Sequence, residues 1–198
     1  MNANAEEVEL RERLDLMQRM IAEGRRTTQR WSWTFLLWGC AYYIAIAWSA
    51  YGKEWYSWPV TMIAAGIATG VLAARIKHSE PSTAIGRALS AVWGVMGTTL
   101  FVVLMALGLS GRADLHLIVV IAGAMLAVAN GISSLILRWK MQFACGLVWL
   151  ATAVGACFAS DTQLAITSLA AIFFCQIVFG IYGMILESRR QGQGSVHA

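Results

Sequence analysis

Six aromatic and amide side chains could together form a binding site, because all lie inside long apolar stretches at similar depth. Counted from the end of its own stretch, each falls about 9–13 Å deep, or slightly deeper, at 1.5 Å per helical residue. A layer of indole, phenol and amide groups predicts a pocket for an apolar or aromatic ligand. The alternative is hydrogen bonding between helices. The six residues are Trp38, Tyr42, Trp93, Asn130, Trp149 and Gln176.

Groups that carry out acid, base or metal chemistry are missing from the same apolar stretches, which hold no Asp, Glu, Lys, Arg or His. Haem between helices would need a His ligand, and a metalloprotease would need a motif such as HExxH. A proton-coupled carrier would need a carboxylate or His within the membrane. Cys40, Cys145, Cys157 and Cys175 show no CxxC spacing. We therefore expect a non-enzymatic protein with no cofactor and no metal.

The stretches that carry the six residues have the length of membrane-spanning helices. Each holds 20 to 25 residues without a charge, and about 20 helical residues cross a hydrocarbon core of roughly 30 Å. The pattern predicts an all-α, polytopic membrane protein with a bundle of six transmembrane helices. The stretches are residues 31–52, 55–74, 88–111, 117–137, 141–160 and 162–186.

Charged residues predict how the chain is threaded. Of 15 Lys and Arg residues, only Lys53 and Arg112 fall on one side of the six stretches, and the other 13 fall on the opposite side. The positive-inside rule then places both termini in the cytoplasm of a multi-pass protein of the cell (inner) membrane. This topology accounts for the net charge of +4 without a nucleic-acid partner. The predicted regions are a cytoplasmic helix (1–30), a transmembrane domain (31–188) and a short cytoplasmic tail (189–198).

Short connections between the stretches predict three antiparallel hairpins. Small residues at four-residue spacing predict faces where helices approach closely, either within the chain or between copies of it. Such pairs occur at Gly66 and Gly70 and at Ala151 and Gly155, and a longer series occurs at Gly123, Ala127 and Gly131. Whether the three hairpins form a true repeat is left open by the sequence.

The first 30 residues predict a charged amphipathic helix. Acid-to-base pairs at i,i+4, such as Glu7 with Arg11, favour the helix. Its apolar stripe needs a neighbour, and the candidates are the membrane surface, a second copy or another protein. Acidic residues in the first turns favour protein, whereas Arg25, Arg26 and Arg30 suit lipid headgroups. The stripe consists of Leu10, Leu14, Met17 and Ile21.

Two functions follow from these features. The first is an accessory, sensory or scaffolding subunit that binds a partner, or a second copy, through residues 1–30. The second is a transporter, channel or ligand-capturing subunit for a small or apolar solute, which would use the aromatic and amide layer. The sequence leaves the ligand, the partner and the oligomeric state open, as well as the continuity of the N-terminal helix with the first span.

Overall fold

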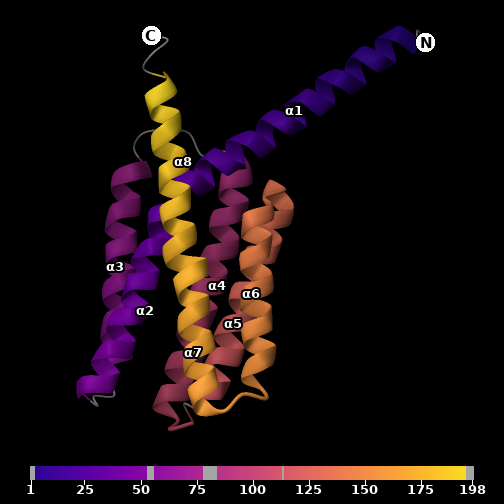
Figure 1. Cartoon of the computed structure of the whole chain (residues 1–198). Helices are drawn as coiled ribbons and strands as arrows, with labels where there is room; N and C mark the ends of the chain where they lie inside the picture. The colour runs from indigo at the N-terminus through magenta and orange to yellow at the C-terminus, as the bar shows by residue number, and fades with distance from the viewer. Residues whose placement is uncertain (1–2, 53–55, 78–83, 113, 195–198) are drawn as a thin grey trace.

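The computed structural model describes residues 3–52, 56–77, 84–112 and 114–194, and within these ranges the regular structure is entirely helical. Figure 1 shows a bundle of roughly parallel and antiparallel helices from which the first helix extends sideways. The helices are α1 (Ala3–Arg30), α2 (Ser32–Gly52), α3 (Ser57–Lys77), α4 (Ala84–Leu109), α5 (Leu115–Leu137), α6 (Lys140–Ala156), α7 (Asp161–Ile172), η1 (Phe173–Val178) and α8 (Phe179–Gly194).

Several of these helices are long and apolar enough to cross a membrane. They are α2 together with α1 from Glu9 onward, α3, α4, α5, and the continuous rod of α7, η1 and α8. The helix α6 is apolar but has only 17 residues. It ends at Ala156, short of the predicted stretch end at 160, because the chain turns at Cys157 and Phe158. The Gln163 side chain then accepts a hydrogen bond from the Ser160 N–H and starts α7.

Packing between the helices is closest for α5 and α6, which belong to different predicted hairpins. The helix α2 packs on α3 on one side and on η1 and α8 on the other, while α4 packs on α5. Phe35, Leu126, Trp149 and Phe179 belong to one buried cluster, so four of these helices share a core. The core therefore lies in the half of the bundle away from α3.

Two glycines on facing helices bring α5 and α6 together. A Cβ at Gly123 would lie 3.1 Å from the Ala153 Cβ, and one at Gly146 would lie 3.3 Å from the Gly131 backbone nitrogen. This confirms the predicted close face of α5. The predicted face of α6 at Ala151 and Gly155 is not used within the described part of the chain, because both residues are exposed and Gly146 and Ala153 face α5 instead. Contact between copies through this face stays a prediction.

The glycine pair of α3 also has no helix packed on it within the described part of the chain. Gly66 and Gly70 are exposed, and a Cβ at either would meet no atom within 4 Å. The reason is that α3 has a single main neighbour, α2, and faces it with other residues, including Thr61 and Ala65. Within the described part of the chain this face therefore has no helix packed on it.

A bend separates α1 from α2, so the two do not form one straight rod (Figure 1). The bend lies at Trp31, which is a turn residue between Arg30 and Ser32. The Ser32 hydroxyl donates to the Thr28 carbonyl at 3.2 Å, and the Thr28 hydroxyl donates to the Gly24 carbonyl at 3.2 Å. Serine and threonine hydroxyls that bond back to the preceding turn bend helices. We attribute the change of direction to this pair.

Candidate functional site

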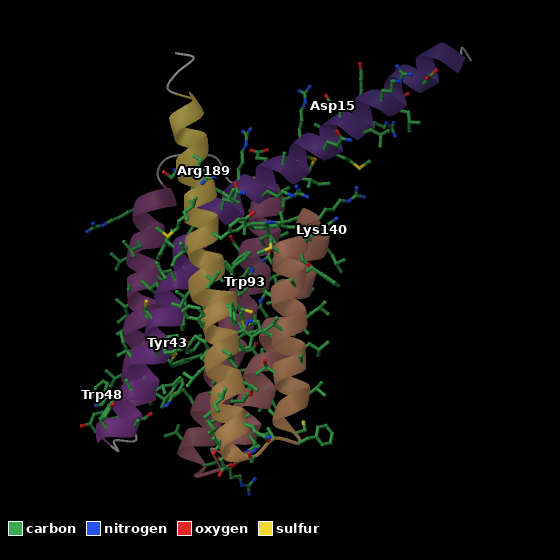
Figure 2. All side chains as sticks on the ribbon, viewed as in Figure 1. Asp15, Tyr43, Trp48, Trp93, Lys140 and Arg189 are labelled. Atoms are coloured by element: carbon green, nitrogen blue, oxygen red, sulfur yellow. The ribbon has the colours of Figure 1, made fainter. Side chains whose placement is uncertain are left out.

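The apolar stripe of α1 lies on the part of the helix that extends beyond the bundle. Leu10, Leu14 and Met17 are 59%, 49% and 56% exposed, and Ile21, nearer the bundle, is half-buried. Figure 2 shows Asp15 on this extended part, far from Trp93 among the packed helices. Leu16 and Met20 are exposed as well, although they lie off the predicted stripe. The extended part of α1 thus presents more apolar surface than the stripe alone.

Three ion pairs within α1 match the predicted i,i+4 pattern. Arg11 binds Glu7 at 2.6 Å, Arg13 binds Glu9 at 2.5 Å, and Arg19 binds Asp15 at 2.6 Å. All six side chains are more than half exposed, and pairs of this kind contribute only about 0.3–0.5 kcal/mol each. They favour the helix without attaching it to the bundle.

The other end of α1 is held firmly on the bundle. Arg25 Nε donates to the Leu137 carbonyl at 2.6 Å, and its Nη2 donates to the Arg138 carbonyl. These carbonyls end α5, where Arg138 takes the left-handed conformation that closes the helix. A cation at a helix C-terminus also interacts favourably with the helix dipole. The sequence suggested lipid headgroups for Arg25, and in the structure its guanidinium caps the C-terminal end of α5.

Gly24 completes this attachment. A Cβ at Gly24 would lie 2.6 Å from Ile85 Cγ2 and 2.8 Å from Leu137 Cδ2, so a side chain here would force Ile85 and Leu137 to shift. The same end of α1 also packs on α8. The helix α1 is therefore anchored at its C-terminal end and extends freely at its N-terminal end.

The predicted aromatic and amide layer is partly brought together. Trp149 is buried in the shared core, and Tyr42 and Trp93 pack against the same cluster. Trp38 lies beside Tyr42, with ring centroids 6.2 Å apart. Gln176 is buried in η1, where its Cβ lies against Gly39 of α2.

Asn130 completes the layer and is also buried, as expected for a residue that faces protein. Its Nδ2 donates to the Leu126 carbonyl of its own helix at 2.8 Å, so it does not link two helices by that bond. Trp93 does link two helices, because its Nε1 donates to Ser133 Oγ at 3.1 Å. Two of the six predicted residues therefore have side-chain hydrogen bonds that serve the fold.

Other polar atoms in the bundle have no hydrogen-bond partner among the described residues. They include Trp149 Nε1, Gln176 Oε1 and both amide atoms of Gln142. Gln142 is fully buried and was missed by the sequence analysis. The sequence offered little indication that Gln142 is buried, because it lies at the second position of an apolar stretch, where an amide is expected to reach the water interface. A π-helical segment such as η1, which holds Gln176, often marks a functional position in a helix.

Two hollows on the molecule lie away from this layer. One is an apolar groove of about 290 Å³ between α5 and α6. The other is a pocket of about 270 Å³ where the bend between α1 and α2 meets α8. None of the six predicted ligand-binding residues lines either hollow. The groove is lined by Ala124, Ala127, Val128, Gly131, Phe143, Gly146, Leu147 and Leu150, and the pocket by Gln29, Arg30, Trp33, Met184, Glu187 and Ser188.

Comparisons with known proteins add no family or fold relative. No protein-family model, curated protein or solved structure matches this chain. Among the residues that the structure describes, no group of three or more His, Cys, Asp or Glu side chains could hold a metal ion. The geometry of α1 and the buried polar groups of the bundle are therefore the features that bear on function.

Proposed function

We propose that this chain is a non-enzymatic membrane subunit that holds out α1 as a binding surface for a protein partner. The observation that carries the proposal is the contrast along α1. Its C-terminal end is attached to α5 through Arg25, which caps that helix. At the other end of α1, Leu10, Leu14 and Met17 are exposed. A fixed attachment reduces the entropy lost when the exposed stripe binds. An accessory or scaffolding subunit uses such a surface.

A protein partner suits the stripe better than the membrane surface. Glu7, Glu9 and Glu12 are exposed beside it, and anionic lipid headgroups would repel them. The direction of α1 also supports a protein partner, because the helix leaves the bundle obliquely (Figure 1). The partner is either a second copy of this chain or another protein that presents an apolar groove.

The proposed placement has six helices crossing the membrane as three hairpins, with both termini in the cytoplasm. The ends of α1 and α5 and the start of α4 lie together, since Gly24 contacts Ile85 and Leu137. These ends carry Arg25, Arg87 and Arg138, which the positive-inside rule assigns to the cytoplasm. Single cysteines at 112 and 138, in a chain without the four native Cys, test this placement. Labelling of 138 by an impermeant reagent outside intact cells would contradict it.

Two leucines on α1 provide a matched test of the partner role. Leu14 and Leu16 are 49% and 60% exposed, and two helical residues differ by about 200° around the axis. We expect Leu14→Asp to weaken self-association or partner binding about tenfold or more, because a buried leucine contributes about 1.5–3 kcal/mol. Leu16→Asp should have a much smaller effect. Mass measurement in mild detergent and identification of the co-purifying proteins distinguish the two. Equal results for both variants would refute the role of the stripe.

A second candidate function is capture of a small or apolar solute within the bundle. The unpartnered buried atoms of Gln142, Trp149 and Gln176 favour it, because buried polar groups normally have partners. A ligand between the helices would satisfy them. Density for a bound molecule at these side chains in an experimental map would support this function. Ordered water alone at all three would count against it.

A further inference from the structure

An open apolar groove lies between α5 and α6 at the outside of the bundle. Its volume is about 290 Å³, and its lining combines small residues such as Gly131 and Gly146 with large side chains such as Leu147. Leu147 is 51% exposed, so the groove is accessible from the surface. Small residues let the backbone of a second helix approach closely. The groove is therefore suited to a transmembrane helix.

A helix with a matching free face lies at the opposite edge of the bundle. In α3, a Cβ at Gly66 or Gly70 would meet no atom within 4 Å. Ile63, Ile67 and Val71 follow the same face and are 47%, 62% and 49% exposed. Figure 1 shows α3 and α6 on opposite sides of the bundle, and α3 packs mainly on α2. The free face of α3 and the groove can therefore meet only between two copies of the chain.

The groove and the free face of α3 lie at similar depth in the proposed membrane placement. Gly70 lies five residues from Arg75 in the sequence, and Gly146 lies six residues from Lys140. At 1.5 Å per helical residue these separations are about 8 and 9 Å. Arg75 and Lys140 both mark the cytoplasmic boundary under the positive-inside rule. Two copies side by side in one membrane would thus bring Gly70 of one copy to the level of Gly146 of the other.

The exposed stripe of α1 faces the same region. Leu10, Leu14 and Met17 follow the helical face that carries Gly24 and Thr28, which are buried against the bundle. Because Gly24 faces the cytoplasmic ends of α4 and α5, the stripe faces the space beside the bundle. Figure 1 shows α1 leaving the bundle on the side where α6 lies. A helix seated in the groove would therefore have its cytoplasmic end next to the stripe.

Charges favour the same arrangement. The cytoplasmic end of α3 carries Arg75, and the extended part of α1 carries Glu12, and both side chains are exposed. In the described part of the chain the structure records no ion pair for either. Opposite charges on two surfaces attract and set the orientation in which the surfaces meet. The basic end of α3 therefore complements the acidic part of α1.

We propose that α3 of a second copy docks in the groove between α5 and α6, with its cytoplasmic end beside α1. The inference rests on the proposed function, because it names a second copy as the partner of α1. Ile67 and Val71 enter the groove, and Gly66 and Gly70 let the two backbones approach. The two surfaces in contact are different, so the contact is heterologous and repeats around a ring or along a row of copies.

Crosslinking between copies tests this contact. In the full-length chain without its four native cysteines, Ile67→Cys combined with Leu147→Cys should form dimers and higher multimers on oxidation in membranes, because the two positions meet only between copies. Val95→Cys combined with Leu147→Cys is the matched control and should stay monomeric. Val95 is 68% exposed and lies eight residues from Arg87, as Ile67 does from Arg75.

Three crosslinking results would overturn the proposal. The first is a test pair that stays monomeric. The second is a control pair that crosslinks as strongly as the test pair, which would indicate random collision in the membrane. The third is a strong crosslink from Ile67→Cys alone, which would show that α3 pairs with α3 of the second copy.

Larger side chains on the free face of α3 should prevent docking. We expect Gly66→Leu combined with Gly70→Leu to weaken self-association about tenfold, because two leucines overpack the contact. Gly94→Leu combined with Gly97→Leu in α4 is the matched control, since a Cβ at either position also meets no atom within 4 Å. Mass measurement in mild detergent reads out the association, and thermal unfolding shows that both variants fold. Equal association of the two variants would refute the docking face.

A charge reversal tests the position of α3 beside α1. Arg75→Glu should weaken self-association about twofold to fivefold, as expected for an exposed ion pair, and adding Glu12→Arg should restore it. Arg189→Glu makes the same change of charge at the exposed end of α8 and should have no effect. Equal losses from Arg75→Glu and Arg189→Glu would contradict the placement of α3 beside α1.

The same measurements separate this inference from the proposed function. If the chain is monomeric and a different protein co-purifies with it in a way that depends on Leu14, the proposed function stands and docking of a second copy is refuted. If the test pair crosslinks while Leu14→Asp and Leu16→Asp associate equally, docking in the groove stands and the role of the stripe is refuted.

Discussion

The glycines on the two sides of α2 have opposite surroundings. Toward α8 and η1, the glycines Gly39, Gly180 and Gly183 leave no room for a Cβ, which would fall 2.0–2.9 Å from atoms of the facing helix. In α3, on the other side, Gly66 and Gly70 face open space. Glycines at similar spacing therefore allow close helix contact between α2 and α8, whereas those of α3 have no helix packed on them. A small-residue pattern shows that close approach is possible, and the neighbouring helix determines whether it happens.

The largest expected effect comes from filling the contact at Gly183. A Cβ there would lie 2.0 Å from Ser32 Oγ and 2.6 Å from Ser32 Cβ, and Ser32 is fully buried. We expect Gly183→Ala to destabilise the protein by about 1–3 kcal/mol through overpacking. Gly70→Ala should be neutral or stabilising by up to about 1 kcal/mol, because alanine is the better helix former. Thermal unfolding in detergent measures both.

A double substitution sharpens this comparison. Ser32→Gly combined with Gly183→Ala moves the missing Cβ from one helix to the other and should recover part of the lost stability. Residues in contact show such coupling, and distant residues do not. If the double variant is only as stable as the sum of the single changes, the close contact between α2 and α8 is incorrect.

A smaller effect is expected at the attachment of α1. Arg25 donates to two carbonyls at the end of α5, whereas Arg19 pairs only with Asp15 on its own helix. We expect Arg25→Gln to cost about 1–2 kcal/mol, because hydrogen bonds from a charged group contribute more than neutral ones and this side chain is partly exposed. Hydrogen exchange of the backbone amides at 22–30 should also rise.

Arg19→Gln is the control for that change. Its exposed pair should contribute less than about 0.5 kcal/mol, and exchange at 22–30 should stay as in the wild type. Equal exchange in the two variants would mean that Arg25 does not hold α1 in place. The proposed difference between an anchored C-terminal part and an extended N-terminal part of α1 would then be incorrect.

The smallest effect is expected from the buried amides of α5 and α6. Asn130 donates to the Leu126 carbonyl of its own helix, so we expect Asn130→Leu to lower stability modestly, by about 0.5–1 kcal/mol. Gln142→Leu should be neutral or stabilising, because neither amide atom has a partner among the described residues. If the bundle captures a solute, both changes should instead abolish its binding. Thermal unfolding with and without a candidate solute distinguishes these outcomes.

Much of the fold could be predicted from runs of residues that are close in sequence. The apolar stretches and the ion pairs of α1 depend on neighbours within a few positions. The ion pairs appear as predicted, and in the described part of the chain five of the stretches form helices long and apolar enough to cross a membrane, whereas α6 is shorter. The aromatic and amide layer was predicted from the depth of each of its six residues in the membrane. Each depth follows from counting residues along a single helix. Its hydrogen bonds could not be predicted, because Ser133, the partner of Trp93, lies on another helix 40 residues away.

The pocket at the bend could not be predicted from the sequence for a related reason. Gln29 and Trp33 are separated from Glu187 by about 150 residues, and no local pattern connects them. We attribute the bend to the hydroxyls of Thr28 and Ser32, two residues that lie outside the predicted apolar stripe. The role of Arg25 is similar, since its acceptors lie 112 and 113 residues away.

By itself, the sequence determined which segments are helical, which are apolar enough for a membrane and which helix carries an exposed stripe. These properties follow from composition and period within one segment. The tertiary structure alone decided which glycines are in contact, how α1 is capped and bent, and where buried polar atoms are left without partners. Each of these depends on atoms from segments far apart in the chain, and their spacing exists only once the helices have packed.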